Sequence, residues 1–213
     1  MKNLLLVLSL VSLCFSCKQK IEKATPTAEI SVAKKIANAH GFKSWKNVSE
    51  VSFTFFEKRS WVWKPKTQDV TLITKQDTIH YNRKTIDSSS IKTDRAFIND
   101  KFWLLIPFQL IWDEGTTISE ATKAIAPISK TQLNKITLTY TNEGGYTPGD
   151  AYDIYFDKNY LIKEWAFRKG NKPKAGLINT FENYQEFSGI KIALDHKKAE
   201  GDWNLNFTDI KIK

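Results

Sequence analysis

The feature that most constrains the fold of this chain is a repeated alternation of apolar and polar residues with a period of two. It occurs in segments 51–55, 136–141, 152–156, 190–194 and 203–207. Because successive side chains of a β-strand point to opposite faces, the pattern predicts antiparallel strands with one dry face and one wet face. Several such strands cannot stay flat and open to water, so they must curl over something apolar.

Two segments with helical character are available to fill such a curved sheet. Residues 30–40 carry apolar side chains at helical spacing and stop before Gly41, a residue typical of helix C-termini. Residues 94–112 are too apolar for a surface loop; Asp94 predicts the N-cap of a helix, and Pro107 predicts its end or a kink. The predicted fold class is mainly β (α+β), a strongly curved antiparallel sheet or incomplete β-barrel wrapped around the N-terminal helix and this helical insertion.

Weaker patterns add further strands and one aromatic pair. The additional strands are expected at 69–75, 77–83, 117–123, 162–168 and 176–184. Trp61 and Trp63 precede a Lys-Pro-Lys sequence, which suggests the tip of a hairpin. There the two indoles would either stack on a sugar, lie at a membrane interface, or cap the open end of the barrel.

The N-terminus has the layout of an export signal. Lys2 precedes an apolar run at 4–15 that is shorter than the roughly 20 residues of a membrane span, and Ser16 and Cys17 follow it. This arrangement resembles a bacterial lipobox, in which cleavage exposes a cysteine that carries a diacylglycerol. We therefore expect residues 1–16 to be a signal peptide, Cys17 to be the lipid attachment site, residues 17–29 to be a tether, and residues 30–213 to form a single domain. Ordinary secretion is the alternative.

Cysteine count and charge exclude several classes of protein. The chain has 2 Cys, both within its first seventeen residues, so the domain has no thiols for disulfides, thiolate zinc sites or cysteine nucleophiles. The net charge of +9 comes from lysines scattered among apolar positions. Export would remove nucleic-acid partners, and weak attraction to an anionic membrane is the more consistent interpretation.

No pattern of catalytic or metal-binding residues stands out. The 3 His of the chain (His40, His80 and His196) are far apart in sequence, and His40 is expected to be packed and hydrogen-bonded rather than catalytic. Asp113-Glu114 is expected to form a solvated turn. There is no Gly-x-Ser-x-Gly and no phosphate-binding glycine loop. The chain is therefore expected to have no catalytic residues, no metal and no cofactor, and not to be an enzyme.

Two motifs resemble a known family. The segment 97–110 (FINDKFWLLIPFQL) and the turn 147–150 (Thr-Pro-Gly-Asp), which leads into a strand with alternating aromatics, resemble patterns of envelope lipoproteins found mainly in Bacteroidota. That group is similar to the LolA-like superfamily, which includes periplasmic lipoprotein carriers of the outer-membrane lipoprotein-sorting type and the regulator RseB. The resemblance covers most of residues 30–213 and implies an incomplete barrel around helices with an apolar cavity. Anchoring through Cys17 departs from the freely diffusing carriers.

These observations lead to one functional hypothesis and two alternatives. The large apolar side chains expected to converge on the concave face, and so to line a cavity, are Phe53, Phe55, Trp103, Ile106, Phe108, Leu138, Ile154 and Trp165. We expect a lipid-anchored protein of the cell envelope, at the outer membrane and facing the periplasm, that binds or carries a lipid, an acyl chain or a lipidated protein. If the same side chains instead fill the space themselves, the protein would be a structural or sensor module that binds a protein partner, as RseB-like members do. A glycan hydrolase is the third hypothesis.

Overall fold

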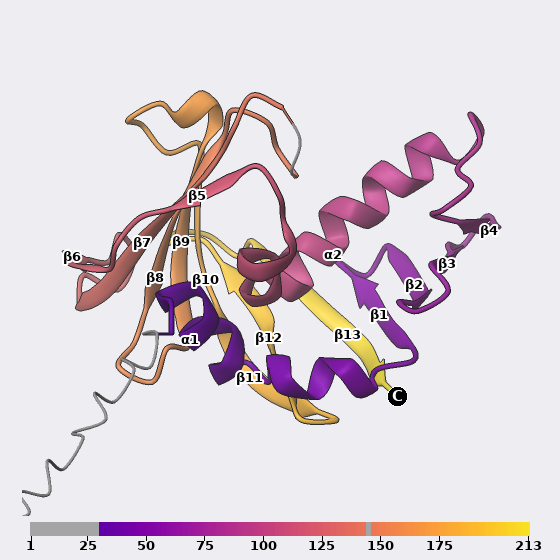
Figure 1. Ribbon diagram of the computed structural model, residues 1–213, viewed down its shortest axis with the longest axis horizontal. Coiled ribbons are helices and arrows are strands. Elements are labelled where there is room, and N and C mark those ends of the chain that lie inside the picture. The colour runs from indigo at the N-terminus through magenta and orange to yellow at the C-terminus, as the bar shows by residue number, and fades with distance from the viewer. Residues whose placement is uncertain (1–29, 144–145) are drawn as a thin grey trace, which may run out of the picture.

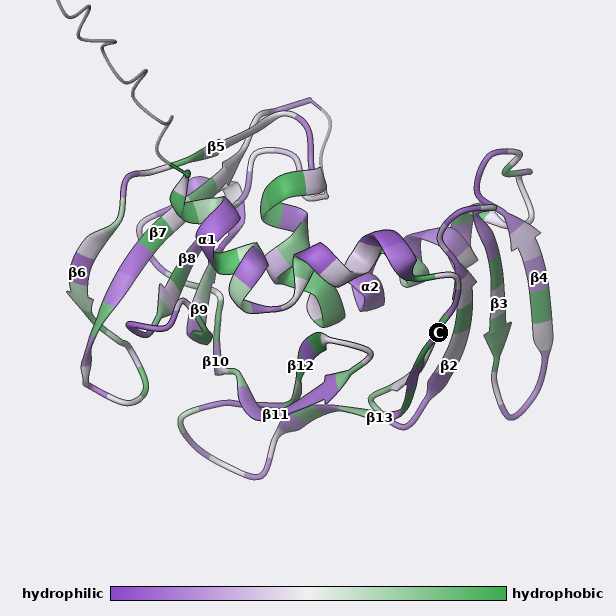
Figure 2. Cartoon of the chain, turned by 60° about the horizontal axis from the view of Figure 1, so that its bottom comes forward, coloured by the Kyte–Doolittle hydropathy of each residue, from purple (hydrophilic) through white to green (hydrophobic). Residues whose placement is uncertain are grey.

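The alternating segments form antiparallel strands in the computed structural model, which describes residues 30–143 and 146–213. Two curved sheets lie on either side of a long helix, α2 (Ile91–Trp112), with a shorter helix, α1 (Val32–Ala39), below it (Figure 1). Hydrophobic and hydrophilic residues alternate along the strands (Figure 2). The mainly β architecture with helices packed against curved antiparallel sheets is confirmed, and the described strands do not close into a complete barrel. The predicted signal peptide, Cys17 and the tether lie outside the described residues.

The first sheet has seven strands in the order β11-β12-β13-β1-β2-β3-β4 within the described residues. Their bounds are Glu182–Phe187 (β11), Ile190–Lys197 (β12), Asn204–Ile212 (β13), Val51–Phe55 (β1), Arg59–Lys64 (β2), Asp69–Ile73 (β3) and Thr78–Asn82 (β4). The C-terminal strand β13 pairs with β1, the first strand of the described chain, so the sheet joins the two ends of the described domain.

The second sheet has the order β10-β9-β8-β7-β5, and the short strand β6 also pairs with β7. The bounds are Leu177–Thr180 (β10), Ile162–Arg168 (β9), Ala151–Phe156 (β8), Gln132–Tyr140 (β7), Thr116–Ile118 (β5) and Thr122–Ile125 (β6). Strand β10 lies close to β12, so the two sheets adjoin there and diverge around α2 (Figure 1).

Helix α2 begins one turn earlier than the sequence pattern predicts. Its N-cap is Ser90, so the prediction of Asp94 as the N-cap is wrong. Asp94 lies in the first turn instead, where its carboxylate accepts hydrogen bonds from Arg83 Nε (2.6 Å) and Tyr81 Oη (3.1 Å). Pro107 stays inside the helix and kinks it, with Leu105 outside the helical region at φ −123°. The predicted end or kink is confirmed as a kink.

Two predicted strands are each divided in the structure. The segment 117–123 becomes β5 and β6, which pair with different parts of β7. The segment 176–184 becomes β10, which pairs with β9, and β11, which pairs with β12 in the other sheet. The halves of the first segment share one partner strand and those of the second pair in different sheets; both divisions depend on tertiary pairing, which local alternation does not encode.

The predicted hairpin tip at Trp61 and Trp63 is wrong. Both indoles are on β2, an interior strand of the first sheet, and are only 1% and 4% exposed. They face α2 together because they are two residues apart, and each packs edge-on against Phe97, with ring centroids 5.3 and 5.6 Å away.

The joint after α1 needs glycine at position 41. A 3₁₀ helix, η1 (Phe42–Asn47), follows α1 directly, and Gly41 adopts φ +89° between them. A Cβ atom at Gly41 would lie 1.9 Å from the carbonyl oxygen of Gly189 in the β11–β12 turn. The nearby Lys191 N–H donates to His40 O at 3.0 Å, so this close approach attaches α1 to the first sheet.

Candidate functional site

The eight residues expected to line a cavity come from both sheets and α2, and all are buried in one apolar cluster. Phe53 and Phe55 lie on β1, Trp103, Ile106 and Phe108 on α2, Leu138 on β7, Ile154 on β8 and Trp165 on β9. Trp103 is the most exposed of them, at 9%. The structure thus brings all eight predicted residues together around α2.

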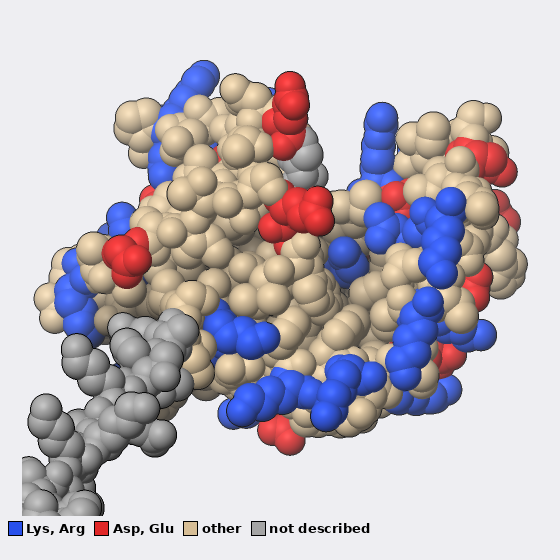
Figure 3. Space-filling view, in the orientation of Figure 1, with Lys and Arg blue, Asp and Glu red and all other residues tan. Residues whose placement is uncertain are grey.

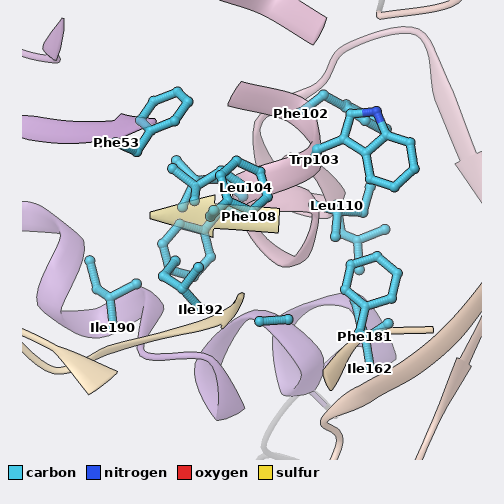
Figure 4. Packing of buried hydrophobic residues seen from close by; sticks show 14 of the residues in the cluster. Phe53, Phe102, Trp103, Leu104, Phe108, Leu110, Ile162, Phe181, Ile190 and Ile192 are labelled. Atoms are coloured by element: carbon cyan, nitrogen blue, oxygen red, sulfur yellow. The ribbon is translucent and has the colours of Figure 1, made fainter. Parts of the chain in front are cut away.

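These residues are packed against other side chains. Trp103 and Trp165 lie edge to face with centroids 4.5 Å apart, and Phe102 stacks on Tyr146 at 3.9 Å. Figure 4 shows Leu104, Phe108 and Leu110 of α2 lying among side chains of the surrounding strands. Among the described residues, none of the eight lines the groove described below or the four other pockets compared with it. A guest that bound between these eight residues would have to displace side chains of α2. Binding of a guest at this position stays a prediction.

A groove of about 990 Å³ opens elsewhere, where α1 and the C-terminal end of α2 meet β5 and the β8–β9 turn. Its apolar lining consists of Val32, Leu110, Ile111, Ile118, Phe156 and Tyr160. Polar residues that also line it include Ser31, Glu120 and Lys158. Ile30, which adjoins the predicted tether, also lines the groove and is 55% exposed.

Local structure explains how the groove is built. Leu110 and Ile111 lie in the last turn of α2, beyond the kink at Pro107. Tyr160 lies in the turn between β8 and β9, where its N–H donates to Asp157 O at 3.0 Å. Its ring stacks on that of Phe156, with the centroids 5.8 Å apart. The groove is thus formed by the ends of several elements, and no sequence pattern predicted it because element ends have no periodicity.

Two of the histidines are structural. His40 Nδ1 lies 2.9 Å from Ile36 O and its Nε2 lies 3.3 Å from Tyr184 Oη, which confirms that this histidine is packed and hydrogen-bonded. His196 Nδ1 lies 3.0 Å from Leu205 O, with its ring between Trp103 and Phe181. Burial lowers the pKa of both imidazoles to about 4, so both are neutral at pH 7.

The pair Asp113-Glu114 is divided between two environments. Glu114 is exposed, as expected of a solvated turn, whereas Asp113 is partly buried and accepts a hydrogen bond of 2.5 Å from Tyr140 Oη. Burial raises the pKa of Asp113. The adjacent carboxylates therefore do not act as a pair, and Asp113 instead ties the end of α2 to β7.

A buried carboxylate that no sequence pattern predicted fixes α2 to the first sheet. Asp100 is fully buried and accepts hydrogen bonds from Arg59 Nε (2.7 Å) and Nη2 (2.8 Å), Trp61 Nε1 (2.8 Å) and Asn99 Nδ2 (2.9 Å). This hydrogen bonding raises the pKa of the Arg59 guanidinium. The one available signal was a carboxylate at an inward position of an apolar helix.

Other kinds of site have little support in this fold. Within residues 30–143 and 146–213, no three His, Cys, Asp or Glu side chains gather in a way that would hold a metal ion. Among the same residues, no helix is both long and apolar enough to cross a membrane. Comparison with protein-family models, curated proteins and solved structures finds no match to this chain. The resemblance to the LolA-like superfamily stays a prediction.

Proposed function

We propose that this protein is a lipid-anchored, non-enzymatic binding protein of the bacterial envelope, which holds one apolar chain in the groove between α1, α2 and β5. The guest is the acyl chain of a lipid or of a lipidated protein. The observation that carries the proposal is the groove itself, whose lining includes the at least partly exposed Ile30, Ile111 and Ile118.

The size and lining of the groove suit such a guest. Its volume of about 990 Å³ is near the upper end of the roughly 300–1,000 Å³ range of small-molecule pockets. Each methylene group removed from water contributes about 0.8 kcal/mol, so a chain of modest length offsets the entropic cost of binding. Serine and charged residues of the lining would interact with a polar headgroup.

The predicted tether supports the same assignment. Ile30 lines the groove, and residues 18–29 separate it from the predicted lipid on Cys17. A fully extended chain spans about 3.3–3.6 Å per residue, so Ile30 would stay within roughly 47 Å of the anchoring membrane. A protein anchored at the outer membrane and facing the periplasm would thereby meet lipids and lipoproteins at short range. We include a LolA-like relationship in this proposal, with the helix between two curved sheets in its favour.

One observation favours the second hypothesis, a module that binds an envelope protein. The interior around α2 is filled by side chains, and apolar residues are exposed on short strands near the sheet edges, with Ile73 of β3 at 42% and Ile125 of β6 at 59%. Isolated exposed isoleucines are common, however, and the two lie in different sheets. The groove therefore has the stronger claim.

A fluorescent fatty acid titrated into the purified full-length protein tests the proposal. Thr116 and Thr117 are adjacent on β5, but only Thr116 lines the groove, since successive side chains face opposite sides. Thr116→Trp should weaken binding of the probe at least about tenfold by occupying the groove, and Thr117→Trp is the matched control that leaves it unchanged. Equal effects of the two variants, or no saturable binding by the unmodified protein, would reject the proposal.

A further inference from the structure

Lys101 of α2 lies in an aromatic environment on the side of the helix that faces β2 and η1. Its Nζ is 5.7 Å from the ring centroid of Trp63 and 6.0 Å from that of Trp112. Trp45 of η1 lies between the two indoles, with centroids 5.5 Å from Trp63 and 4.8 Å from Trp112. Two tryptophans thus lie within about 6 Å of one ammonium group, and a third packs against both of them, an arrangement that a surface lysine does not need.

Within residues 30–143 and 146–213, the ammonium of Lys101 has ring contacts but no hydrogen bond or ion pair. Among the described residues, the nearest carboxylates that act on it are Asp113 and Asp94, which attract it only over a distance. Asp113 is hydrogen-bonded to Tyr140, and Asp94 to Arg83 and Tyr81. Burial, followed by repulsion from Arg83, lowers the pKa of Lys101 to about 8. The ammonium is thus held in an environment that an added anion would stabilise.

Arg83 supplies a second cation, whose charge acts on Lys101. Its guanidinium lies over the ring of Phe97, at 5.4 Å, and Phe97 in turn packs against Trp63. Asp94 accepts hydrogen bonds from Nε and Nη2 of this arginine. Because a guanidinium has five N–H donors, further donors remain for another acceptor.

The site is open to solvent. Lys101, Trp45, Trp112 and Arg83 are each partly exposed. Figure 3 shows a hollow over the middle of α2, with lysine and arginine side chains in it and along the side towards β2–β4. None of Lys101, Arg83, Trp63 or Trp112 lines the groove between α1, α2 and β5. The Lys101 site is therefore separate from the groove, and a ligand could bind there whether or not the groove holds an acyl chain.

We propose that Lys101 and Arg83, with the indoles of Trp63 and Trp112, form a binding site for a phosphate group. A phosphate accepts charge-assisted hydrogen bonds from both cations and offsets their mutual repulsion. The tryptophans reduce the access of water to the ammonium and offer apolar surface to whatever carries the phosphate. A phospholipid headgroup and a soluble phosphate share this chemistry, and the test distinguishes them.

Calorimetric titration of the full-length protein in a neutral detergent measures the site with three probes. These are dihexanoylphosphatidylglycerol, inorganic phosphate and dihexanoylglycerol, which has the same acyl chains without the phosphate. Binding of both phosphate probes indicates a soluble ligand or a headgroup alone, whereas binding of the phospholipid only indicates a lipid. Either result supports the site. Equal affinity for dihexanoylglycerol and dihexanoylphosphatidylglycerol, or no binding of either phosphate probe at millimolar concentration, overturns it.

Three variants assign any binding to Lys101. Lys101→Met keeps an unbranched stem against the indoles and removes the charge, so the dissociation constant for the phosphate probe should rise about tenfold or more. Lys101→Arg should retain most of the affinity. Lys92→Met, at an exposed lysine on the same helix, makes the same charge change away from the site and should have no effect. If Lys101→Met and Lys92→Met behave alike, the site is not at Lys101.

A second measurement guards against loss of folding in Lys101→Met. The phosphate probe should raise the melting temperature of the unmodified protein and of Lys92→Met, because a ligand that binds only the folded state stabilises it. It should leave the melting temperature of Lys101→Met unchanged. An equal rise in all three proteins would contradict the assignment.

Discussion

Removal of the Asp100 carboxylate should detach α2 from the first sheet more than any change to an exposed ion pair. In Asp100→Ala, Trp61 Nε1 loses its acceptor inside the core, where the tryptophan is 1% exposed. A buried donor left without an acceptor costs about 1–3 kcal/mol. Arg59 loses both of its hydrogen bonds to the carboxylate, although its side chain, 32% exposed, regains some water.

The total effect combines these two losses. Removing one partner of a buried ion pair costs about 3–5 kcal/mol, and the partial hydration of Arg59 offsets part of the additional loss at Trp61. We therefore expect Asp100→Ala to lower the free energy of unfolding by about 3–5 kcal/mol. In a protein of this size each kcal/mol lowers the melting temperature by about 2–4 °C, so the fall should be roughly 6–20 °C.

Urea denaturation followed by tryptophan fluorescence, together with thermal melting, measures this effect. The matched control is Glu182→Ala, which breaks an ion pair with Lys197 whose side chains are 41% and 49% exposed. Exposed pairs contribute little, so this control should melt close to the unmodified protein. If Asp100→Ala were no less stable than Glu182→Ala, the carboxylate would not be what holds α2 in place.

Three further predictions concern pH, a backbone joint and the anchor. His40 and His196 have a pKa of about 4 when folded and 6.5 otherwise, so the unfolded chain binds more protons and stability falls as the pH decreases from about 6.5 to about 4. Each histidine contributes roughly 3 kcal/mol of stability over that window, at about 1.36 kcal/mol per pKa unit. The difference between the urea midpoints at pH 7 and pH 4.5 should be clearly smaller in His196→Phe than in the unmodified protein. An equal difference in the two proteins would contradict this. Gly41→Ala places a Cβ 1.9 Å from Gly189 O at φ +89°, so it should lower the free energy of unfolding by at least about 2 kcal/mol. An unchanged midpoint of thermal melting would contradict this prediction. Cys17→Ser should move the protein out of the membrane fraction on cell fractionation, and retention there would disprove lipid anchoring.

The strands with strict alternation were predictable because one of their faces packs on α2. In β1, Phe53 and Phe55 are 1% and 5% exposed, whereas Ser52 and Thr54 on the other face are only partly buried. The same contrast in burial made the helix at 30–40 and the apolar insert recognisable, because burial imposes a period on the sequence.

The choice of partner strand was not predictable. Residues 177–180 and 182–187 resemble one continuous strand in sequence, yet they pair with β9 and β12 in different sheets, and Phe181 lies at the change. The start of α2 was also not predictable. Asp94 accepts hydrogen bonds from Arg83 and Tyr81 and does not cap the helix, which begins after Ser90. Both outcomes depend on which other elements the segment contacts, and a local pattern does not contain that information.

The candidate site shows the same limit. Alternation identified residues such as Phe53 and Leu138 as facing inward, and both are buried. An apolar pattern is the same whether side chains fill a space or surround one, so it did not distinguish a packed core from a cavity. The groove was missed because it is formed where α1 begins, α2 ends and β5 passes. Lys101 was missed because the two indoles beside it come from β2 and from the end of α2.

Photocrosslinking with a diazirine-labelled fatty acid, followed by peptide mapping of the full-length protein, tests most directly whether a guest occupies the groove. Labelled peptides should contain Leu110–Ile111 at the end of α2, Ile118 on β5, or Tyr160 after the β8–β9 turn, the residues that line the groove. An excess of unlabelled fatty acid should abolish the labelling. Labelling concentrated at the core residues Phe53 and Leu138, or labelling that the competitor does not reduce, would contradict the groove as the binding site.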